Sequence, residues 1–589
     1  MIRASAPLPY RVLVLAELAP RKPEGGAAPP QGPFRLTAQT FDDLMAALVG
    51  TVPLLAQSPS AGRIQTEVPL ASFAGLRPER IARKLPHLAT LNAVRETLAA
   101  LRDGKASLEE TRRALRGSGH PLGGELADAL RPAPVDENAP TRVVSPTRAE
   151  AEGGIFDLIS GAPSDAPAPA GAAERGALDA VRRAIAGIAS GAKVRSGSEK
   201  EAAREAIEAV DAVWSAELAA VLGHPEFRRL ETLWRGVRFF LERAELTDDV
   251  RVEVVSASRA DAPELLAKLG SEADDSGAEE AVGLVIADYD WDTSGASWTA
   301  LRGLARAAAE MPAPLVTSVG PAFFGKADLE SVIAIEDLDK HFEGEDYKKW
   351  QGLRDDDESA WLTLVLNRFP LRYPHGEATE GKDGPRYREG DAWLFGNAVW
   401  GVGALPANAF ARTAWPCDLL GPDPGGRLGG LPIRPVKDRS GTERQIGLEA
   451  HVHEDVRRAF NRAGFSILSD VRESDEAVFV AAPAAHAGGR HADQGRDRLP
   501  YRAFTTRAAQ FVRFVAESMG PVGSEEEAML QMAAGMSALL GGSPREEGYM
   551  VQAGRDPDRG NRIAITVSLD PRGRVPGGGP PAEITVWTR

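Results

Sequence analysis

Cysteine is nearly missing from this sequence: Cys417 is the one thiol among 589 residues. A single thiol cannot form a disulfide within the chain, and it excludes zinc sites built from several cysteines. No run of 18 apolar residues occurs, so no transmembrane helix is predicted. Positive charge is also in deficit, with 69 Lys and Arg against 84 Asp and Glu. A net charge of −15 without a basic stripe argues against nucleic acid as a partner and against insertion into, or docking on, an anionic membrane.

The chain is too long for one hydrophobic core, because single cores stop growing near about 250–300 residues. We therefore expect two or more domains. The 60 Gly and 43 Pro indicate many turns and at least one linker. The apolar run near the N-terminus is broken at Glu17, too early for a convincing signal peptide, so we expect a cytoplasmic protein.

The first block, residues 1–131, contains both strand and helix patterns. The β-branched, apolar run Arg11–Leu15 predicts a strand, and Phe34–Leu36 a short one. Apolar residues recur at helical spacing from Phe41 to Leu48. Thr40 and Asp43 are spaced to cap the first turn of this helix reciprocally.

Residues 132–176 differ in composition from both neighbouring blocks. They are rich in Pro, Ala, Gly and Ser and cannot bury enough surface to offset the entropy of ordering, so we expect a disordered linker. One apolar island interrupts the linker, formed by Ile155, Phe156, Leu158 and Ile159. The island either docks on its own protein or is recognised by a partner.

The second block, residues 177–589, alternates helix and strand patterns. Helices are expected over 207–221, 230–241 and 298–309, and strands over 250–255, 282–287 and 315–319. Strands that alternate with helices predict an α/β core, within an α+β chain of several domains. Two further strand patterns, Ile563–Leu569 and Glu583–Trp587, lie near the end of the sequence.

An acidic cluster follows the predicted strand over 282–287. Asp288, Asp290 and Asp292 alternate there with aromatic residues. An Asp290/Asp292 pair at the end of a strand could hold magnesium in a phosphohydrolase. The simpler interpretation is that these acids cap the next helix, and no phosphate-binding Gly loop accompanies them.

Two further patterns could form ligand sites. His451 and His453 would share one face of a strand and could bind zinc, but no spacing selects a third ligand from His486, His491 or a distant acid. The glycine-rich segment Gly425–Gly430 lacks a strand–loop–helix frame and predicts a turn. We expect no catalytic residue, metal or cofactor.

Several collinear segments carry a family likeness. Gly223–Val237, Asp288–Trp291 and Asn367–Pro374 resemble, in order, motifs of the large subunit of the type VI secretion contractile sheath (TssC/VipB family). Asn367 and His375 depart from the usual Pro and Tyr. The residues that carry the likeness are Leu230, Glu231, Trp234, Arg235, Gly236, Asp288, Arg368, Phe369 and Arg372.

The first block resembles the sheath small subunit (TssB/VipA family). The matching order is Arg11–Leu15, Phe41–Met45, Val68–Phe73, Leu76–Ile81 and Leu88–Arg95. The two subunits are usually separate chains, so the resemblance implies a fusion that fixes their ratio at one to one.

The resemblance implies a structural protomer that forms a helical homopolymer around an inner tube, meets a baseplate and contracts to drive effector translocation. Neighbouring protomers would share a small β-sheet, because exposed strand edges accept further strands. The strands expected to cross between protomers contain Arg11, Val12, Leu13, Val14, Leu15, Ile563, Ile565, Val567, Ile584 and Val586. The linker island resembles the segment that a AAA+ unfoldase recognises for disassembly. A related contractile injection particle, a magnesium-dependent phosphohydrolase and a non-polymerising adaptor remain as alternatives.

Overall fold

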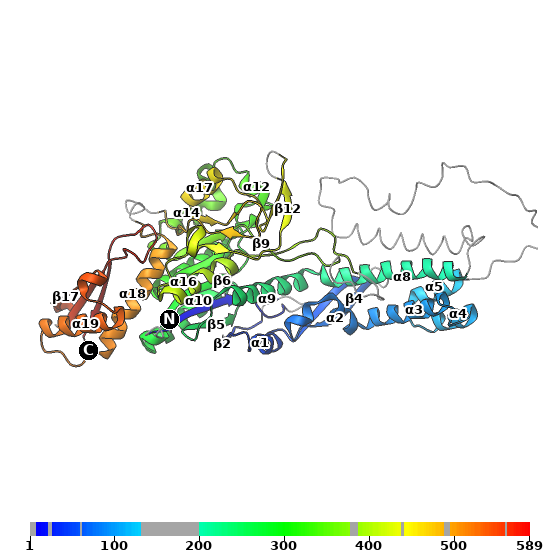
Figure 1. Ribbon diagram of the computed structural model, residues 1–589, viewed down its shortest axis with the longest axis horizontal. Helices are drawn as coiled ribbons and strands as arrows, with labels where there is room; N and C mark the ends of the chain where they lie inside the picture. Colours follow the sequence, from blue (N-terminus) through cyan, green and yellow to red (C-terminus); the bar gives the residue numbers. More distant parts are fainter. Residues whose placement is uncertain are drawn as a thin grey trace, which may run out of the picture.

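The computed structural model describes residues 8–21, 26, 28–58, 62–130, 199–376, 387–437, 441–487, 495–559 and 562–588. The molecule is elongated, with a helical arm at one end, a central sheet and a C-terminal sheet at the other end (Figure 1). The predicted linker over 132–176 and its island Ile155–Ile159 lie outside the described residues. In the described ranges no helix is both long enough and apolar enough to span a bilayer.

A seven-stranded sheet in the order β14-β8-β7-β6-β1-β5-β2 forms the centre of the molecule. Its strands are β1 (Tyr10–Ala16), β2 (Gln31–Arg35), β5 (Val250–Ser256), β6 (Val282–Asp288), β7 (Leu315–Ser318), β8 (Leu362–Leu366) and β14 (Phe465–Ile467). All neighbours pair in parallel except β2, which runs antiparallel to β5. The strands expected over 250–255, 282–287 and 315–319 are confirmed.

Both faces of this sheet are covered by helices. On one face Val12 and Val14 of β1 join the core formed with α9 (Pro225–Arg243), α15 (Val399–Val402) and α16 (Ala404–Thr413). On the other face Leu13 and Leu15 join the core of α10 (Ala262–Asp275), α11 (Gly295–Glu310), α12 (Leu329–Ile333), α13 (Leu338–Phe342), α14 (Lys348–Asp355) and α17 (Glu454–Arg462). A strand buried on both faces needs apolar side chains at every position, which explains the continuous run in β1.

The position of β1 corrects one prediction. Arg11–Leu15 was expected to join a neighbouring protomer's sheet, but β1 pairs with β5 along one edge and with β6 along the other. Both edges are occupied within the chain, so β1 offers no free backbone groups to another copy. The first block therefore supplies a central strand to the sheet of the second block.

The helical arm joins the two blocks a second time. It contains α1 (Phe41–Leu48), α2 (Pro78–Lys84), α3 (Pro86–Arg102), α4 (Leu108–Arg116), α5 (Pro121–Ala129), α8 (Glu199–Leu222) and the hairpin of β3 (Thr51–Ser58) and β4 (Gly62–Pro69). Helices α3 and α8 lie side by side (Figure 1), and Arg95 Nε lies 2.6 Å from Asp211 Oδ1 between them. Helix α1 forms as predicted, but the reciprocal cap is wrong. Thr40 has helix-like φ and ψ angles and its hydroxyl contacts Thr37 instead.

A separate core lies beneath the C-terminal sheet. Helices α18 (Leu499–Ser518), α19 (Glu525–Leu540) and α20 (Pro544–Glu547) precede the antiparallel strands β17 (Tyr549–Asp556), β18 (Arg562–Leu569) and β19 (Ala582–Trp587). The smaller strands are β9 (Phe369–Arg372) with β10 (Leu394–Gly396), β12 (Arg434–Lys437) with β13 (Glu443–Ile446), and β11 (Arg427–Leu428), β16 (Ala477–Val478) and β15 (Ser469–Asp470).

Candidate functional site

Four charged side chains form a buried ion cluster between α9 and β9. Arg372 donates from Nε to Glu231 Oε1 at 2.9 Å and from Nη1 to Glu389 Oε2 at 2.5 Å, and Arg235 donates to Glu231 at 2.8 Å. The side chains of Glu231 and Glu389 are only 2% and 4% exposed. Burial would raise the pKa of Glu231, but the two guanidinium groups outweigh it and hold the pKa below its ordinary value. The cluster keeps α9 fixed against the β9–β10 ribbon.

A second cluster fixes α9 against the central sheet. The Trp234 indole donates to the Leu18 carbonyl at 3.2 Å. Gly236 lies where any side chain would overlap the indole of Trp400. That indole donates from Nε1 to Asp288 Oδ2 at 2.8 Å. The glycine therefore allows the close approach that lets the tryptophan reach the end of β6.

Asp288 itself lies at the buried end of β6. Its other carboxylate oxygen accepts a hydrogen bond of 2.7 Å from Asn397 Nδ2. Burial raises the pKa of Asp288 to about 7, while the hydrogen bonds from Asn397 and Trp400 act in the opposite direction. With both oxygens engaged, this carboxylate holds α15 and the segment before it against the sheet.

The other acids of this cluster do not act as a pair. Asp292 accepts hydrogen bonds from Ser294 N and from the hydroxyls of Ser294 and Ser297 at the start of α11. The N-cap of that helix is Ser294, and the Asp292 carboxylate holds this cap in place, so its role is structural and close to the simpler of the two sequence-based interpretations. Asp290 is exposed on the other side, in a cavity, so the two carboxylates do not converge as a magnesium site requires.

The histidine pair also has structural partners. His451 Nδ1 lies 2.9 Å from Asp470, and the ring of His453 packs edge-on against His451 with centroids 4.7 Å apart. The pair lies in a loop rather than in the predicted strand. His486 lies 3.0 Å from Asp497. No group of three potential metal ligands occurs among the described residues, and His491 is outside them.

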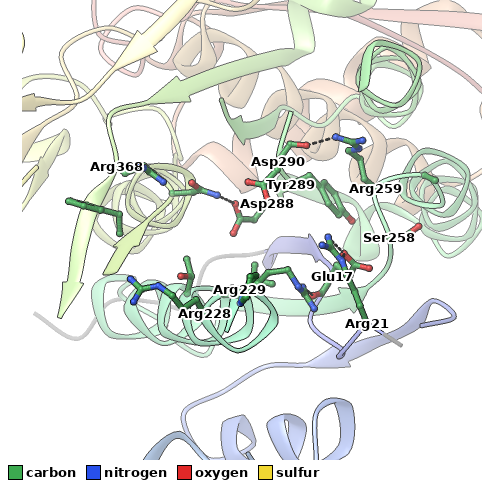
Figure 2. A pocket seen from close by; sticks show the side chains of 16 residues that line it. Glu17, Arg21, Arg228, Arg229, Ser258, Arg259, Asp288, Tyr289, Asp290 and Arg368 are labelled. Atoms are coloured by element: carbon green, nitrogen blue, oxygen red, sulfur yellow. Dashed lines mark hydrogen bonds and ion pairs between the residues drawn. The ribbon is translucent and has the colours of Figure 1, made fainter. Parts of the chain in front are cut away.

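A cavity of about 610 Å³ lies at the carboxyl ends of β1, β5 and β6. It is lined by Arg21, Arg228, Arg229, Arg259 and Arg368, together with Glu17, Asp288, Tyr289 and Asp290 (Figure 2). Of these, Asp288, Asp290 and Arg368 were singled out from the sequence. The remaining arginines come from three separate segments, and no local motif joins all of them.

The C-terminal sheet has one central and two outer strands. Ile563, Ile565 and Val567 belong to β18, which pairs with β17 along one edge and with β19 along the other. The prediction that β18 crosses to another protomer is therefore wrong, because both its edges are used. Ile584 and Val586 belong to β19, which is an outer strand.

The backbone of β19 presents one edge away from its own sheet. The Thr588 N–H donates to the Ile563 carbonyl at 3.0 Å. N–H groups alternate along a strand, so those of Ile584 and Val586 also face β18. Those of Glu583, Thr585 and Trp587 therefore face outward, and in the described residues no strand pairs with them.

Two family models and one curated sequence relative match parts of this chain. Residues 204–486 match the family described as EvpB/VC_A0108, tail sheath N-terminal domain, and residues 3–117 match the family described as Type VI secretion system, VipA, VC_A0107 or Hcp2. The type VI secretion system sheath protein TssC1 of Pseudomonas aeruginosa is 24% identical over 390 residues, which cover 60% of this chain and 77% of that protein. A chain in the cryo-EM structure of the anti-feeding prophage baseplate aligns with a TM-score of 0.33 and 13% identity, over 57% of this chain and 76% of that one.

The fold and the matched domains define a tail-sheath protein of contractile type. The chain belongs to the type VI secretion sheath family and carries a VipA domain and a VipB domain in one polypeptide. The predicted fusion of small and large sheath subunits is thereby confirmed.

Proposed function

We propose that this chain is the protomer of a sheath that assembles helically in the cytoplasm around an inner tube, starting from a baseplate. Contraction of the sheath drives the tube and its effectors outward. The family membership supports a structural role, and the fusion ensures that each protomer contains both subunit types. Energy would be stored during assembly, so the mechanism needs neither catalytic residues nor a cofactor.

The observation that carries the proposal is the outward edge of β19. Its backbone N–H and C=O groups at Glu583, Thr585 and Trp587 can bind an added strand from another copy. Ile584 and Val586 alternate with these residues and pack on the core beneath the sheet. A contact of this head-to-tail kind, repeated without closure, produces an open helical filament.

Contraction then requires rigid bodies joined by small contacts. The ion cluster around Glu231 fixes α9 to the β9–β10 ribbon, and the Trp400–Asp288 hydrogen bond fixes α15 to the central sheet, so this part of each protomer would move as a unit. Strand connections between copies would act as hinges. The linker island Ile155–Ile159 would serve a AAA+ unfoldase that disassembles spent sheath.

Electron microscopy of the full chain tests the proposal. Negative-stain images of the purified protein should contain tubes of uniform diameter, and deletion of Ala582–Trp587 should abolish them. A monodisperse, small species at high concentration would favour the adaptor alternative. A magnesium-dependent phosphatase activity that is lost in Asp290→Asn would favour the enzyme alternative, although the hydrogen bonds that Asp292 accepts from Ser294 and Ser297 argue against it.

A further inference from the structure

The cavity at the carboxyl ends of β1, β5 and β6 has a position and size that the sheath architecture does not explain. Open α/β sheets bind ligands in the crevice outside the carboxyl ends of their strands. Its volume of about 610 Å³ lies within the range of small-molecule pockets, roughly 300–1,000 Å³. Tyr289, Phe395 and Leu233 add apolar surface to a lining that is otherwise charged.

Arg259 is the lining arginine with the fewest hydrogen bonds among the described residues. Among the described residues it donates one hydrogen bond, to the backbone carbonyl of Asp290, and it forms no ion pair. Its guanidinium lies 5.9 Å from the centre of the Trp291 ring, which restricts its orientation. A guanidinium has five N–H donors in a fixed plane, so most of its donor capacity is available to a ligand.

Three further arginines face the cavity from other elements. Arg21 pairs with Glu17, Arg228 contacts Glu389 at 3.1 Å, and Arg368 pairs with a glutamate outside the lining. These partners fix each side chain without using all of its donors. Arg229 differs, because its guanidinium already donates hydrogen bonds to two backbone carbonyls and a carboxylate.

Three acidic side chains in the lining partly offset the positive charge of the arginines. Glu17 is already paired with Arg21, and both oxygens of Asp288 accept hydrogen bonds within the protein. Asp290 is exposed and lies between Arg368 and Arg259, which are on opposite sides of it (Figure 2). A ligand that brings its own negative groups would replace this carboxylate as the counter-charge of the surrounding arginines.

From this arrangement we propose that the cavity binds a small anion that carries at least two phosphate or carboxylate groups. Arg259 would hold one group and Arg368 the other, with Arg21 and Arg228 at the rim. Guanidinium groups suit this chemistry because they bind phosphate and carboxylate oxygens through paired hydrogen bonds. This anion site does not depend on strand addition at β19. Loss of anion binding and loss of polymerisation can therefore be observed independently of each other.

Calorimetric titration of the full chain at low salt tests the site, with sodium pyrophosphate and a tricarboxylate as alternative probes. One of them should bind with about one site per chain. Arg259→Gln should weaken binding by about tenfold or more, because a charge-assisted hydrogen bond is lost. Asp290→Asn should strengthen it. Arg306→Gln, which removes an exposed arginine of α11 paired with Glu310, should leave it unchanged.

The tighter of the two probes identifies the source of the anionic groups. The proposal is overturned if neither probe gives saturable binding, or if Arg259→Gln and Arg306→Gln lose affinity equally, because the attraction would then be non-specific. Circular dichroism of each variant without ligand separates misfolding from loss of the site. If Arg259→Gln does not fold, an unchanged affinity in Asp290→Asn is sufficient to reject the proposal.

Discussion

The outward edge of β19 can be blocked at a single backbone position. Thr585 is exposed and its N–H faces away from β18, so Thr585→Pro removes one donor from the free edge and keeps the ladder within the sheet. Proline is tolerated on edge strands whose N–H points to solvent. The substitution also removes the hydroxyl that lies 2.9 Å from Thr566, so Thr585→Val is the matched control.

The expected effect follows from the hydrogen bonds at one junction. Losing a donor leaves the acceptor on the incoming strand unpaired, which costs about 1–3 kcal/mol at each contact between copies. Because 1.4 kcal/mol is a factor of ten, the critical concentration for tube formation should rise by about 5- to 150-fold. Thr585→Val keeps the N–H and should shift the critical concentration by less than about fivefold.

Sedimentation over a range of protein concentrations measures this quantity directly. The supernatant concentration at which pelleting begins should be highest for Thr585→Pro, and circular dichroism should show unchanged folding. Equal critical concentrations for the proline variant, the valine variant and the unmodified chain would refute strand addition at β19. Polymerisation would then depend on another surface.

Three further predictions concern stability. Gly236→Ala should destabilise the chain by about 1–3 kcal/mol in urea, because the new methyl group overlaps the indole packed on α9, whereas Gly124→Ala, with open space around it, should be nearly neutral. Arg372→Met should cost about 3–5 kcal/mol, since it removes the cation that bridges the two buried carboxylates Glu231 and Glu389, and Arg306→Met at an exposed pair should leave the free energy of unfolding nearly unchanged. For Asp288, whose pKa rises from 3.8 to about 7 on folding, the folded state holds the extra proton between these values. Stability should therefore fall from pH 4 to pH 7 relative to Asp288→Asn, by a few kcal/mol at most in thermal melts, and a constant difference would contradict this assignment.

Local pattern was sufficient to predict most elements but not their neighbours. The run in β1 correctly predicted a strand, but that strand was expected to join the sheet of a neighbouring protomer. An uninterrupted apolar run indicates burial on both faces, which is typical of a central parallel strand, and this pattern argued against a strand added to another copy. Which strands flank β1 depends on partners more than 200 residues away in the sequence, so periodicity alone cannot supply them.

In the candidate site too, residues within a local motif were predicted, whereas residues that converge from distant segments were not. Glu231, Trp234, Gly236 and Asp288 were identified by resemblance. The structure shows that Glu231 fixes α9 to the β9–β10 ribbon and that the other three hold α9 and α15 against the central sheet. Arg259 was missed because its importance arises from convergence with arginines on other segments. No spacing in the sequence indicates that convergence.

The central position of β1 has a consequence for biosynthesis. Its neighbour in the sheet is made much later than β1 itself, because 242 positions separate Arg11 from Glu253 on the strand beside it. At about 5–20 residues per second, roughly 10–50 s pass before that partner has been made. During this interval an apolar segment that belongs in the middle of the protein stays without its neighbours. Translation speed and chaperone access should therefore affect the yield of this fused chain more strongly than they would for either subunit made alone.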